Sequence, residues 1–350
     1  MSSCESKSLT TTRIALSRRA RTSLDAARGL SAIYVVLHHA FKDTQGVGFL
    51  LSFGQEAVLV FFLLSGFVIF ANENHRVDQF GRYYLRRLRR IYPPLLCAMA
   101  VSTILWLGGW LQAAFSWSSF LGTLASLQDI SFLKPGVIVD PYLGNDPLWS
   151  LSYEVAFYLL FPIVMAAWRR SITLTRWIVP VAAVVAYGLY LLSPNHFALV
   201  VAYFLTWWLG AMAAYLYGKD RLSLSRSMPE LAGVVLLIAA AGVGIWLYGF
   251  KGAGYFPFLM FRHFLVVAAL YVVLLTPLRA LLATLFSLTA RPAAQVASIS
   301  YGLYVVHYPI LVQTGAAQSP IWVLPALGAT VIVAYIADRW SPALFPKAPR

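Results

Sequence analysis

The sequence contains little charge, few cysteines and no room for a large soluble domain. Only 11% of its 350 residues are charged, whereas an average soluble domain carries about 25%. The two cysteines, Cys4 and Cys97, form neither a disulfide framework nor a set with the spacing of metal ligands. We therefore exclude a disulfide-stabilised secreted domain and predict no metal site.

Hydrophobic residues make up 60% of the chain, and they gather in runs of roughly 20, the length that crosses a bilayer. This pattern predicts an all-α integral membrane protein with about ten transmembrane helices. The expected membrane domain covers residues 24–340, between a disordered basic tail at 1–23 and a short cytoplasmic tail at 341–350. We expect the transmembrane helices at about 26–44, 55–73, 91–112, 148–168, 177–193, 197–217, 229–249, 255–276, 294–314 and 320–338.

Basic residues outnumber acidic ones by 27 to 13 and fall mainly on one side of the predicted membrane. Only Lys42, Lys134, Lys251 and Arg262 lie on or near the opposite side. The positive-inside rule therefore places both termini in the cytoplasm. Because the charges line one membrane face and form no stacking platform with aromatic residues, we predict no nucleic-acid partner.

The longest predicted outer loop, residues 113–147, is rich in proline and glycine and carries Asp129, Asp140 and Asp146. So long a loop in a compact chain is a candidate substrate platform or lid. A solvated connector between two spans is the alternative, and the sequence leaves both open.

The first predicted span holds Arg28 and His39, which lie 11 residues apart and so share one helix face, about 16 Å from each other. His38 points about 80° away from that face. An ionisable side chain within the bilayer is costly and usually faces a bundle interior or a wet cavity. The alternative makes Arg28 an interfacial anchor and His39 a hydrogen-bonding partner between helices.

Two further groups lie in and after the second predicted span. Ser65, beside Gly66 near the middle of the membrane, either lets another helix pack closely or borders a substrate. After that span, Arg86, Arg87 and Arg90 gather on one side of a predicted helix. Topology setting and attraction to lipid headgroups are one explanation. Bidentate binding of phosphate, as in coenzyme A, is the other, and it explains the preference for arginine over lysine.

Polar residues recur within two later spans. Glu154 lies about 8 Å inside the fourth span, where a carboxylate is expensive unless it is paired; the neighbouring Trp149 also suits an interfacial aromatic belt. Ser300, Tyr304 and His307 follow i, i+4, i+7 spacing and form one polar stripe in the ninth span. A structural hydrogen-bond network is the alternative for this stripe.

Helix rise and orientation place four titratable residues at similar depths, between the membrane midplane and its outer boundary: His39, Glu154, His263 and His307. Titratable groups that converge in a cavity are the default candidate for an active site. The sequence therefore predicts a proton-handling centre reached from outside and an anion-binding entrance on the cytoplasmic side.

These motifs together resemble the acyltransferase 3 family of integral membrane acyltransferases, over nearly the whole chain. Two departures are Ala57 after Glu56, where many members have glycine, and His38 beside His39, which leaves two candidate imidazoles. The chain resembles the stand-alone form, without an extracytoplasmic hydrolase-like domain. The similar segments are Arg28 with His39, Phe61–Phe67, Arg87 and Arg90 with Ile91 and Pro93, Trp149–Leu151 with Glu154, Phe157 and Tyr158, and Ser300, Tyr301, Tyr304 and His307.

The resemblance implies transfer of an acyl group, commonly acetyl, from cytoplasmic acyl-CoA (acetyl-CoA) to a hydroxyl of an exported carbohydrate, in a multi-pass protein of a bacterial inner (plasma) membrane. His39 would be the general base or carry the acyl group covalently. Glu154 would orient it or bind the acceptor, and Arg28 would support the donor thioester. Arg86, Arg87 and Arg90 would bind the coenzyme A phosphates, and the cavity would be lined by Ser65, Trp149, Ser300, Tyr304 and His307.

A transporter or flippase for a lipid-linked sugar or anion is the alternative, because buried Glu and His form proton relays and Arg clusters bind phosphate in such proteins. Transporters often contain internal repeats with matching broken helices. No second copy of the Arg28/His39 pair or of the Trp-Ser-Leu…Glu segment is found in this sequence.

Overall fold

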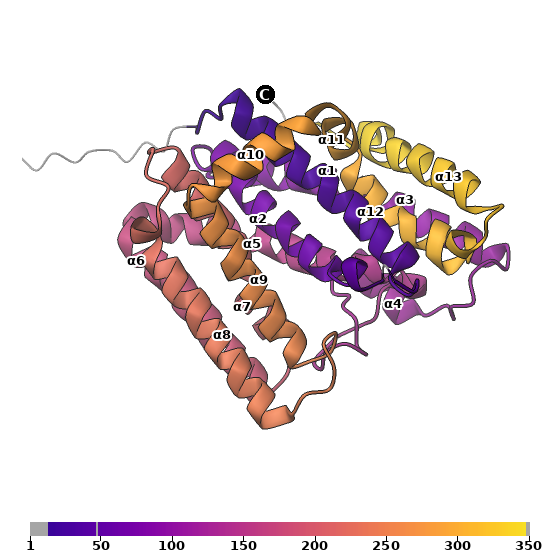
Figure 1. The fold of residues 1–350 in the computed structure, drawn as a ribbon, viewed down its shortest axis with the longest axis horizontal. Helices are drawn as coiled ribbons and strands as arrows, with labels where there is room; N and C mark the ends of the chain where they lie inside the picture. The colour runs from indigo at the N-terminus through magenta and orange to yellow at the C-terminus, as the bar shows by residue number, and fades with distance from the viewer. Residues whose placement is uncertain (1–12, 47, 348–350) are drawn as a thin grey trace, which may run out of the picture.

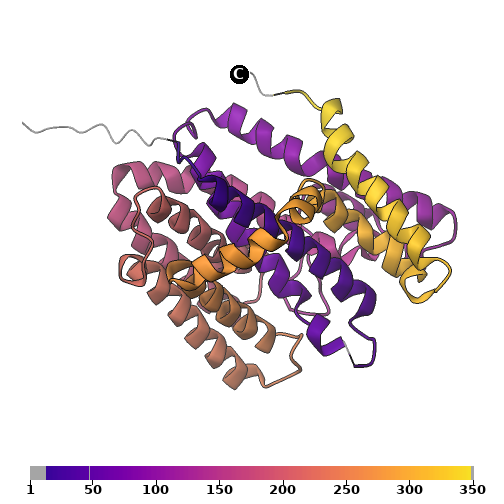
Figure 2. The same ribbon diagram turned by 45° about the horizontal axis from the view of Figure 1, so that its top comes forward.

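The computed structural model describes residues 13–46 and 48–347, and no β-strand occurs among them. Figures 1 and 2 show a bundle in which α6, α8 and α9 lie on one side of the central helices and α3, α12 and α13 on the other. The helices are α1 (Arg18–Phe41), α2 (Gly54–Glu73), α3 (Phe80–Leu107), α4 (Trp117–Leu124), α5 (Trp149–Arg170), α6 (Ile172–Leu192), α7 (His196–Tyr217), α8 (Met228–Tyr248), α9 (Phe258–Leu275), α10 (Leu278–Leu288), α11 (Ala290–Ala297), α12 (Ser300–His307) and α13 (Val323–Tyr335). Short 3-10 and π-helical turns join them, among them η1 (Gly48–Leu51), η5 (Tyr308–Gln313), η7 (Ile336–Trp340) and η8 (Ser341–Leu344).

Eight helices of the described chain are long and apolar enough to cross a membrane. The all-α membrane fold is thereby confirmed. The other two predicted spans differ from the eight for identifiable reasons. α1 is long, but Asp25, Arg28 and two histidines dilute its apolar character. The region predicted at 294–314 is divided into α11, α12 and the π-helix η5. The two exceptions are therefore the segments that carry most of the candidate catalytic residues.

The predicted boundary of the amino-terminal tail at residue 23 is wrong. α1 begins at Arg18, because the Ser17 side chain accepts a hydrogen bond from the Ala20 amide and caps the helix. The preceding segment is also fixed, since the Ile14 amide donates to the Ala71 carbonyl at 3.1 Å. Residues 1–12 of the predicted tail lie outside the described residues.

The centre of the bundle is the contact between α2 and α7, which is close because both helices present glycine there. A Cβ atom on Gly66 would lie 1.9 Å from the Trp207 carbonyl oxygen, and one on Gly210 would lie 1.9 Å from that of Leu63. Small residues allow backbones to approach in this way. In the Ser65-Gly66 pair, Gly66 thus serves helix packing, and Ser65 is left to border the cavity described below.

The long outer loop is anchored to the bundle near its middle. Lys134 and Asp129 form an ion pair at 2.8 Å, and both are buried. The Tyr153 hydroxyl of α5 donates to Asp129 at 2.6 Å, and the Lys134 ammonium lies 4.5 Å from the centre of the Trp149 ring. The interpretation as a solvated connector is therefore wrong for this part of the loop, because its charges face the protein and not water.

Candidate active site

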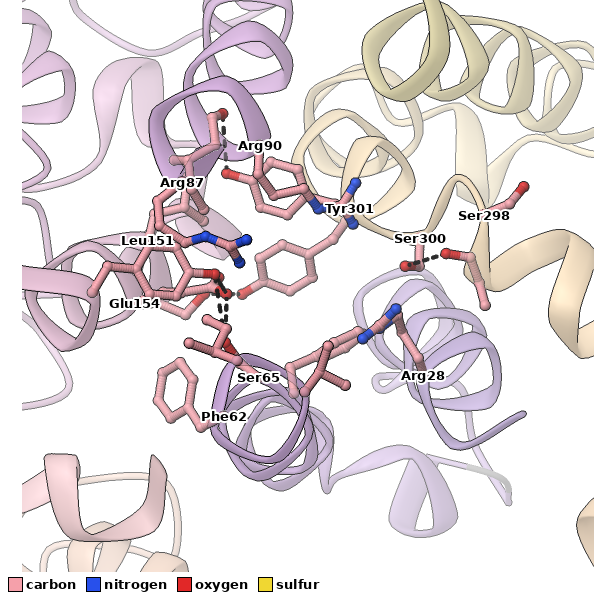
Figure 3. A pocket seen from close by; sticks show the side chains of 18 of the residues that line it. Arg28, Phe62, Ser65, Arg87, Arg90, Leu151, Glu154, Ser298, Ser300 and Tyr301 are labelled. Carbon is pink, nitrogen blue, oxygen red and sulfur yellow. Dashed lines mark hydrogen bonds between the residues drawn. The ribbon is translucent and has the colours of Figure 1, made fainter. Parts of the chain in front are cut away.

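A cavity of about 760 Å³ lies among α1, α2, α3, α5, α11 and α12. In Figure 3 the side chains of Arg28, Arg87 and Glu154 point into the same space from three of these helices. The lining residues include seven basic and two acidic ones, so the cavity suits an anionic ligand. These charged residues are Asp25, Arg28, Arg86, Arg87, Arg89, Arg90, Glu154, Arg339 and Lys347.

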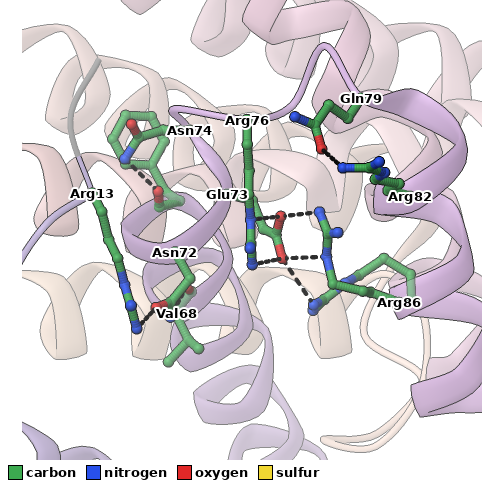
Figure 4. A network of polar contacts seen from close by, with 11 residues as sticks. Arg13, Val68, Asn72, Glu73, Asn74, Arg76, Gln79, Arg82 and Arg86 are labelled. Carbon is green, nitrogen blue, oxygen red and sulfur yellow. Dashed lines mark hydrogen bonds and ion pairs between the residues drawn. The ribbon is translucent and has the colours of Figure 1, made fainter. Parts of the chain in front are cut away.

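Glu73, at the end of α2, organises the arginine cluster of α3 (Figure 4). It is 1% exposed and accepts two hydrogen bonds from Arg86, at 3.0 and 2.5 Å. Arg87 forms an ion pair with the same carboxylate at 3.4 Å, and Arg76 forms another at 2.9 Å. Arg86, predicted to bind the coenzyme A phosphates, lines the cavity, but two of its N–H groups already donate to Glu73. Arg87 has more of its donors available, and its guanidinium lies over the Tyr83 and Tyr158 rings.

Arg90 and Arg28 complete the basic part of the cavity. Arg90 pairs with Asp338 at 3.2 Å and lies 5.4 Å from the centre of the Tyr301 ring. Asp338 is itself fixed by the Gly302 amide at 2.7 Å. Arg28 has no ion-pair partner within the described ranges and is only partly buried, so its donors are available to a ligand.

Glu154 is held within the cavity by a chain of hydrogen bonds. Ser65 donates to Glu154 at 3.2 Å, Trp207 donates to Ser65 at 3.2 Å, and the Tyr158 hydroxyl also donates to Glu154. This arrangement meets the requirement that a carboxylate within the membrane be paired. It also fixes the orientation of the carboxylate within the cavity.

Ser150 and Tyr304 form a second polar group of the cavity, with their hydroxyls 2.9 Å apart. Tyr304 donates to the Pro147 carbonyl at 2.6 Å, so Ser150 donates to Tyr304. Ser300 borders the cavity but donates to the Ala297 carbonyl. Trp149 was predicted to line the cavity, but the structure contradicts this. Its ring packs against Phe62 and Lys134 instead, one position out of phase with Ser150.

His39 and His307 form a pair beyond the Tyr304 end of the cavity, and neither is among its lining residues. The prediction that His307 lines the cavity is therefore wrong, because α12 turns it towards α1 while Tyr304 faces the cavity. His39 Nδ1 lies 3.0 Å from His307 Nε2 and 3.0 Å from the Val35 carbonyl oxygen. The His307 and Tyr304 ring centres are 6.3 Å apart, so the pair adjoins the cavity.

The hydrogen bonds of the pair assign its tautomers. His307 Nδ1 lies 3.0 Å from the Leu303 carbonyl, so this nitrogen carries the proton and Nε2 is an acceptor. His39 Nδ1 then donates to His307, which leaves the lone pair of His39 Nε2 for a proton. His38 is engaged elsewhere, with the Leu51 carbonyl of η1.

The prediction that four titratable groups converge in one cavity is wrong for His263, and of the other three only Glu154 lines the cavity, while His39 and His307 pair with each other. The Nδ1 of His263 is hydrogen-bonded to the Tyr203 hydroxyl at 2.5 Å, and its Nε2 lies 4.0 Å from Glu56, which pairs with Arg262. Equal depth along four helices does not determine the direction in which each side chain points, and α9 turns His263 towards α2 and α7.

Sequence reasoning missed Glu73, Trp207 and Asp338, and it named Ser150 and Tyr158 only as part of the family resemblance, without a role in the site. Ser150 lies inside the Trp-Ser-Leu segment and could have been found from its phase with Glu154, four residues on. Asp338 lies 248 residues from Arg90 in the sequence, and Glu73 lies at the end of α2, whereas Arg86 and Arg87 belong to α3. In the part of the chain that the structure describes, no cluster of His, Cys, Asp or Glu could hold a metal ion.

Comparison with known proteins assigns a family to this arrangement. A family model described as "Acyltransferase domain" matches residues 21–339. Nodulation protein 10 of Rhizobium leguminosarum bv. viciae is 27% identical over 319 residues, 83% of each chain. Peptidoglycan O-acetyltransferase OatA of Listeria monocytogenes is 25% identical over 93% of this chain, which spans 55% of that protein. Acyltransferase MdmB of Streptomyces mycarofaciens is 33% identical over 42% of this chain and 37% of its own length. No solved structure matches the chain significantly.

Proposed function

Because the chain belongs to the acyltransferase domain family, we propose that it moves an acetyl group from acetyl-CoA to a hydroxyl of a carbohydrate on the other side of the membrane. The protein is a multi-pass membrane acyltransferase that does not transfer aminoacyl groups. The acetyl group and the carbohydrate acceptor are supported by the name of the relative OatA, a peptidoglycan O-acetyltransferase. The distribution of basic residues supports cytoplasmic termini, and the family resemblance implies a bacterial inner (plasma) membrane.

One observation carries the proposal: a single cavity connects a group of arginines to Glu154 and Tyr304 and ends beside the His39–His307 pair. The phosphates of acetyl-CoA would be held by Arg87 and Arg90, whose planar guanidinium groups match phosphate oxygens. Arg28 has no ion-pair partner within the described ranges and would bind the donor closer to its thioester.

The chemistry follows from the tautomers of the pair. His39 Nε2 accepts the proton of the acceptor hydroxyl while the hydroxyl oxygen attacks the thioester carbonyl. The carbon–sulfur bond breaks, the coenzyme A thiolate leaves, and the proton on His39 passes to that sulfur or to solvent. His307 accepts the hydrogen bond of His39 Nδ1 and so holds the ring in the tautomer that a base requires. Covalent transfer through His39 uses the same nitrogen as nucleophile and divides the reaction into two steps.

The proposal is tested with membrane vesicles that contain the full chain and its native acceptors, supplied with acetyl-labelled acetyl-CoA. We expect label to appear as an alkali-labile ester on carbohydrate. Arg87→Gln should raise KM for acetyl-CoA, because it removes a donor to phosphate without touching the acyl-transfer centre. Arg82→Gln is the matched control, because Arg82 lies on the same helix but does not line the cavity. Carbohydrate that crosses the membrane unlabelled and chemically unchanged would instead support the transporter or flippase hypothesis.

A further inference from the structure

A second cavity, of about 510 Å³, lies on the opposite side of α1 from the acyl-transfer cavity. It is bordered by α1, α2, α9 and α10, and most of its lining is aliphatic or aromatic. Leu24, Ala27 and Leu30 of α1 face it, whereas Asp25 and Arg28 of the same helix face the first cavity. We call this second cavity the apolar groove.

The apolar groove is basic as well as apolar. Arg19 and Arg279 line it, and no acidic residue is among its lining residues. Arg19 donates to the Ala280 carbonyl at 3.2 Å and to the Thr284 hydroxyl at 3.0 Å, and Arg279 donates to the Thr276 carbonyl at 2.9 Å. Neither has a carboxylate partner within the described residues. Arg86, Arg90, Arg169 and Arg176 each have one, as the ion pairs show. Each of the two guanidinium groups therefore keeps donors for an external anion.

The helix α10 covers part of the apolar groove. This 11-residue helix is apolar, none of its residues is buried, and it crosses α1 near one end of that helix (Figure 1). The two hydrogen bonds from Arg19 tie α10 to α1 over the groove. In a multi-pass membrane protein, such a helix separates the groove from the bilayer without filling it.

We propose that the apolar groove binds one phospholipid with an anionic headgroup. Its acyl chain would lie among Leu30, Leu63 and Leu274, and its phosphate would be bound by Arg19 and Arg279. Apolar area alone would suit any lipid, but two arginines without carboxylate partners favour a negative headgroup. The binding does not depend on the reaction catalysed in the other cavity.

Lipid bound in the groove would pack against the face of α1 that is turned away from the acyl-transfer cavity. Residues 24, 27 and 30–31 of α1 would rest on the lipid, while residues 25 and 28 face the acyl-transfer cavity. We therefore expect removal of the lipid to lower the thermal stability of the purified protein, both with and without the acyl donor.

The test uses the full chain purified in a non-ionic detergent. Thermal stability is measured as phosphatidylglycerol or phosphatidylcholine with the same acyl chains is added, and lipid that co-purifies is identified by mass spectrometry. We expect phosphatidylglycerol to raise the melting temperature by several degrees more than phosphatidylcholine. The double variant Arg19→Gln/Arg279→Gln should weaken the response to phosphatidylglycerol roughly tenfold or more. The matched control Arg18→Gln/Arg291→Gln removes the same charge from exposed neighbours that do not line the groove, and it should respond like the wild type.

A second variant tests lipid binding without changing the two arginines of the groove. Ala283→Trp places a large side chain into the groove from the exposed helix α10 and should abolish the difference between the two lipids. The proposal is overturned if both lipids protect equally, if inorganic phosphate protects as well as phosphatidylglycerol, or if both the double variant and Ala283→Trp respond like the wild type. None of these outcomes bears on acyl transfer, which is measured separately with acetyl-CoA.

Discussion

The hydrogen bond between His39 Nδ1 and His307 Nε2 makes the roles of the two imidazoles separable by substitution. His39→Ala removes the proposed base, and a positioned base contributes about 100- to 10,000-fold to rate. His307→Ala removes only an acceptor of the His39 N–H, and the Val35 carbonyl at 3.0 Å remains to hold the same tautomer. One neutral hydrogen bond contributes about 0.5–1.5 kcal/mol, so the expected loss is roughly two- to twelvefold.

The assay compares initial rates of acetyl transfer from labelled acetyl-CoA in vesicles with matched amounts of each variant. His307→Gln should recover part of the loss, because its amide oxygen can accept the hydrogen bond from His39. His38→Ala serves as the control for the neighbouring ring, since His38 is bonded to the Leu51 carbonyl and has no contact with His307. Its rate should stay close to that of the wild type.

Two results would refute this reasoning. If His307→Ala is as inactive as His39→Ala and glutamine does not rescue it, His307 itself handles the proton or carries the acyl group. If His38→Ala abolishes transfer while His39→Ala does not, the assignment of the acting imidazole from helix phase is wrong.

Three other substitutions test the surrounding structure. Lys134→Met should destabilise the protein by about 3–5 kcal/mol, because it leaves the buried Asp129 charge unpaired. The double variant Lys134→Met/Asp129→Leu should recover much of this loss of stability in a denaturation experiment. Burial alone would raise the pKa of Asp129, but Lys134 and the hydrogen bonds to its carboxylate outweigh burial and hold the pKa below its usual value. The stability that Asp129 contributes should therefore be complete at neutral pH and be lost as the pH falls below about 4; a denaturation midpoint that rises on acidification would contradict this. Glu73→Gln should raise KM for acetyl-CoA several-fold with less effect on kcat, because Arg87 and its neighbours lose their common anchor; an unchanged KM would show that Glu73 is only structural. Gly66→Leu should prevent assembly of a stable bundle, whereas Gly188→Ala, where a Cβ atom meets open space, should not, and the yield of monodisperse protein checks both.

Most of the fold was predictable because bilayer spans leave a direct hydrophobic signal. Arg28, the α3 arginines, Ser65, Glu154 and Tyr304, all chosen from the sequence, line the same cavity. Helix periodicity placed His38 and His39 in different directions, and the two rings make different hydrogen bonds, but which imidazole acts stays a prediction. These predictions depend only on geometry within one helix.

Predictions that needed the direction of a side chain between helices succeeded less often. His263 shares the depth of His39 but faces Tyr203, and Trp149 is one residue out of phase with the cavity that Ser150 borders. The carboxylates that hold the arginines, Glu73 and Asp338, could not be paired with them from the sequence. The rotation of each helix about its axis is set by packing against its neighbours, and a single sequence does not record it.

The sequence by itself determined the membrane class, the helical content, the family and the residue types that carry the chemistry. Each of these follows from composition, from hydrophobic runs or from spacing along a single helix. Only the tertiary structure decided that His39 meets His307, that Glu73 commits Arg86, and that α1 separates a polar cavity from an apolar groove. The physical reason is that these features depend on contacts between different helices, which exist only once close helix packing has fixed the position and rotation of every helix.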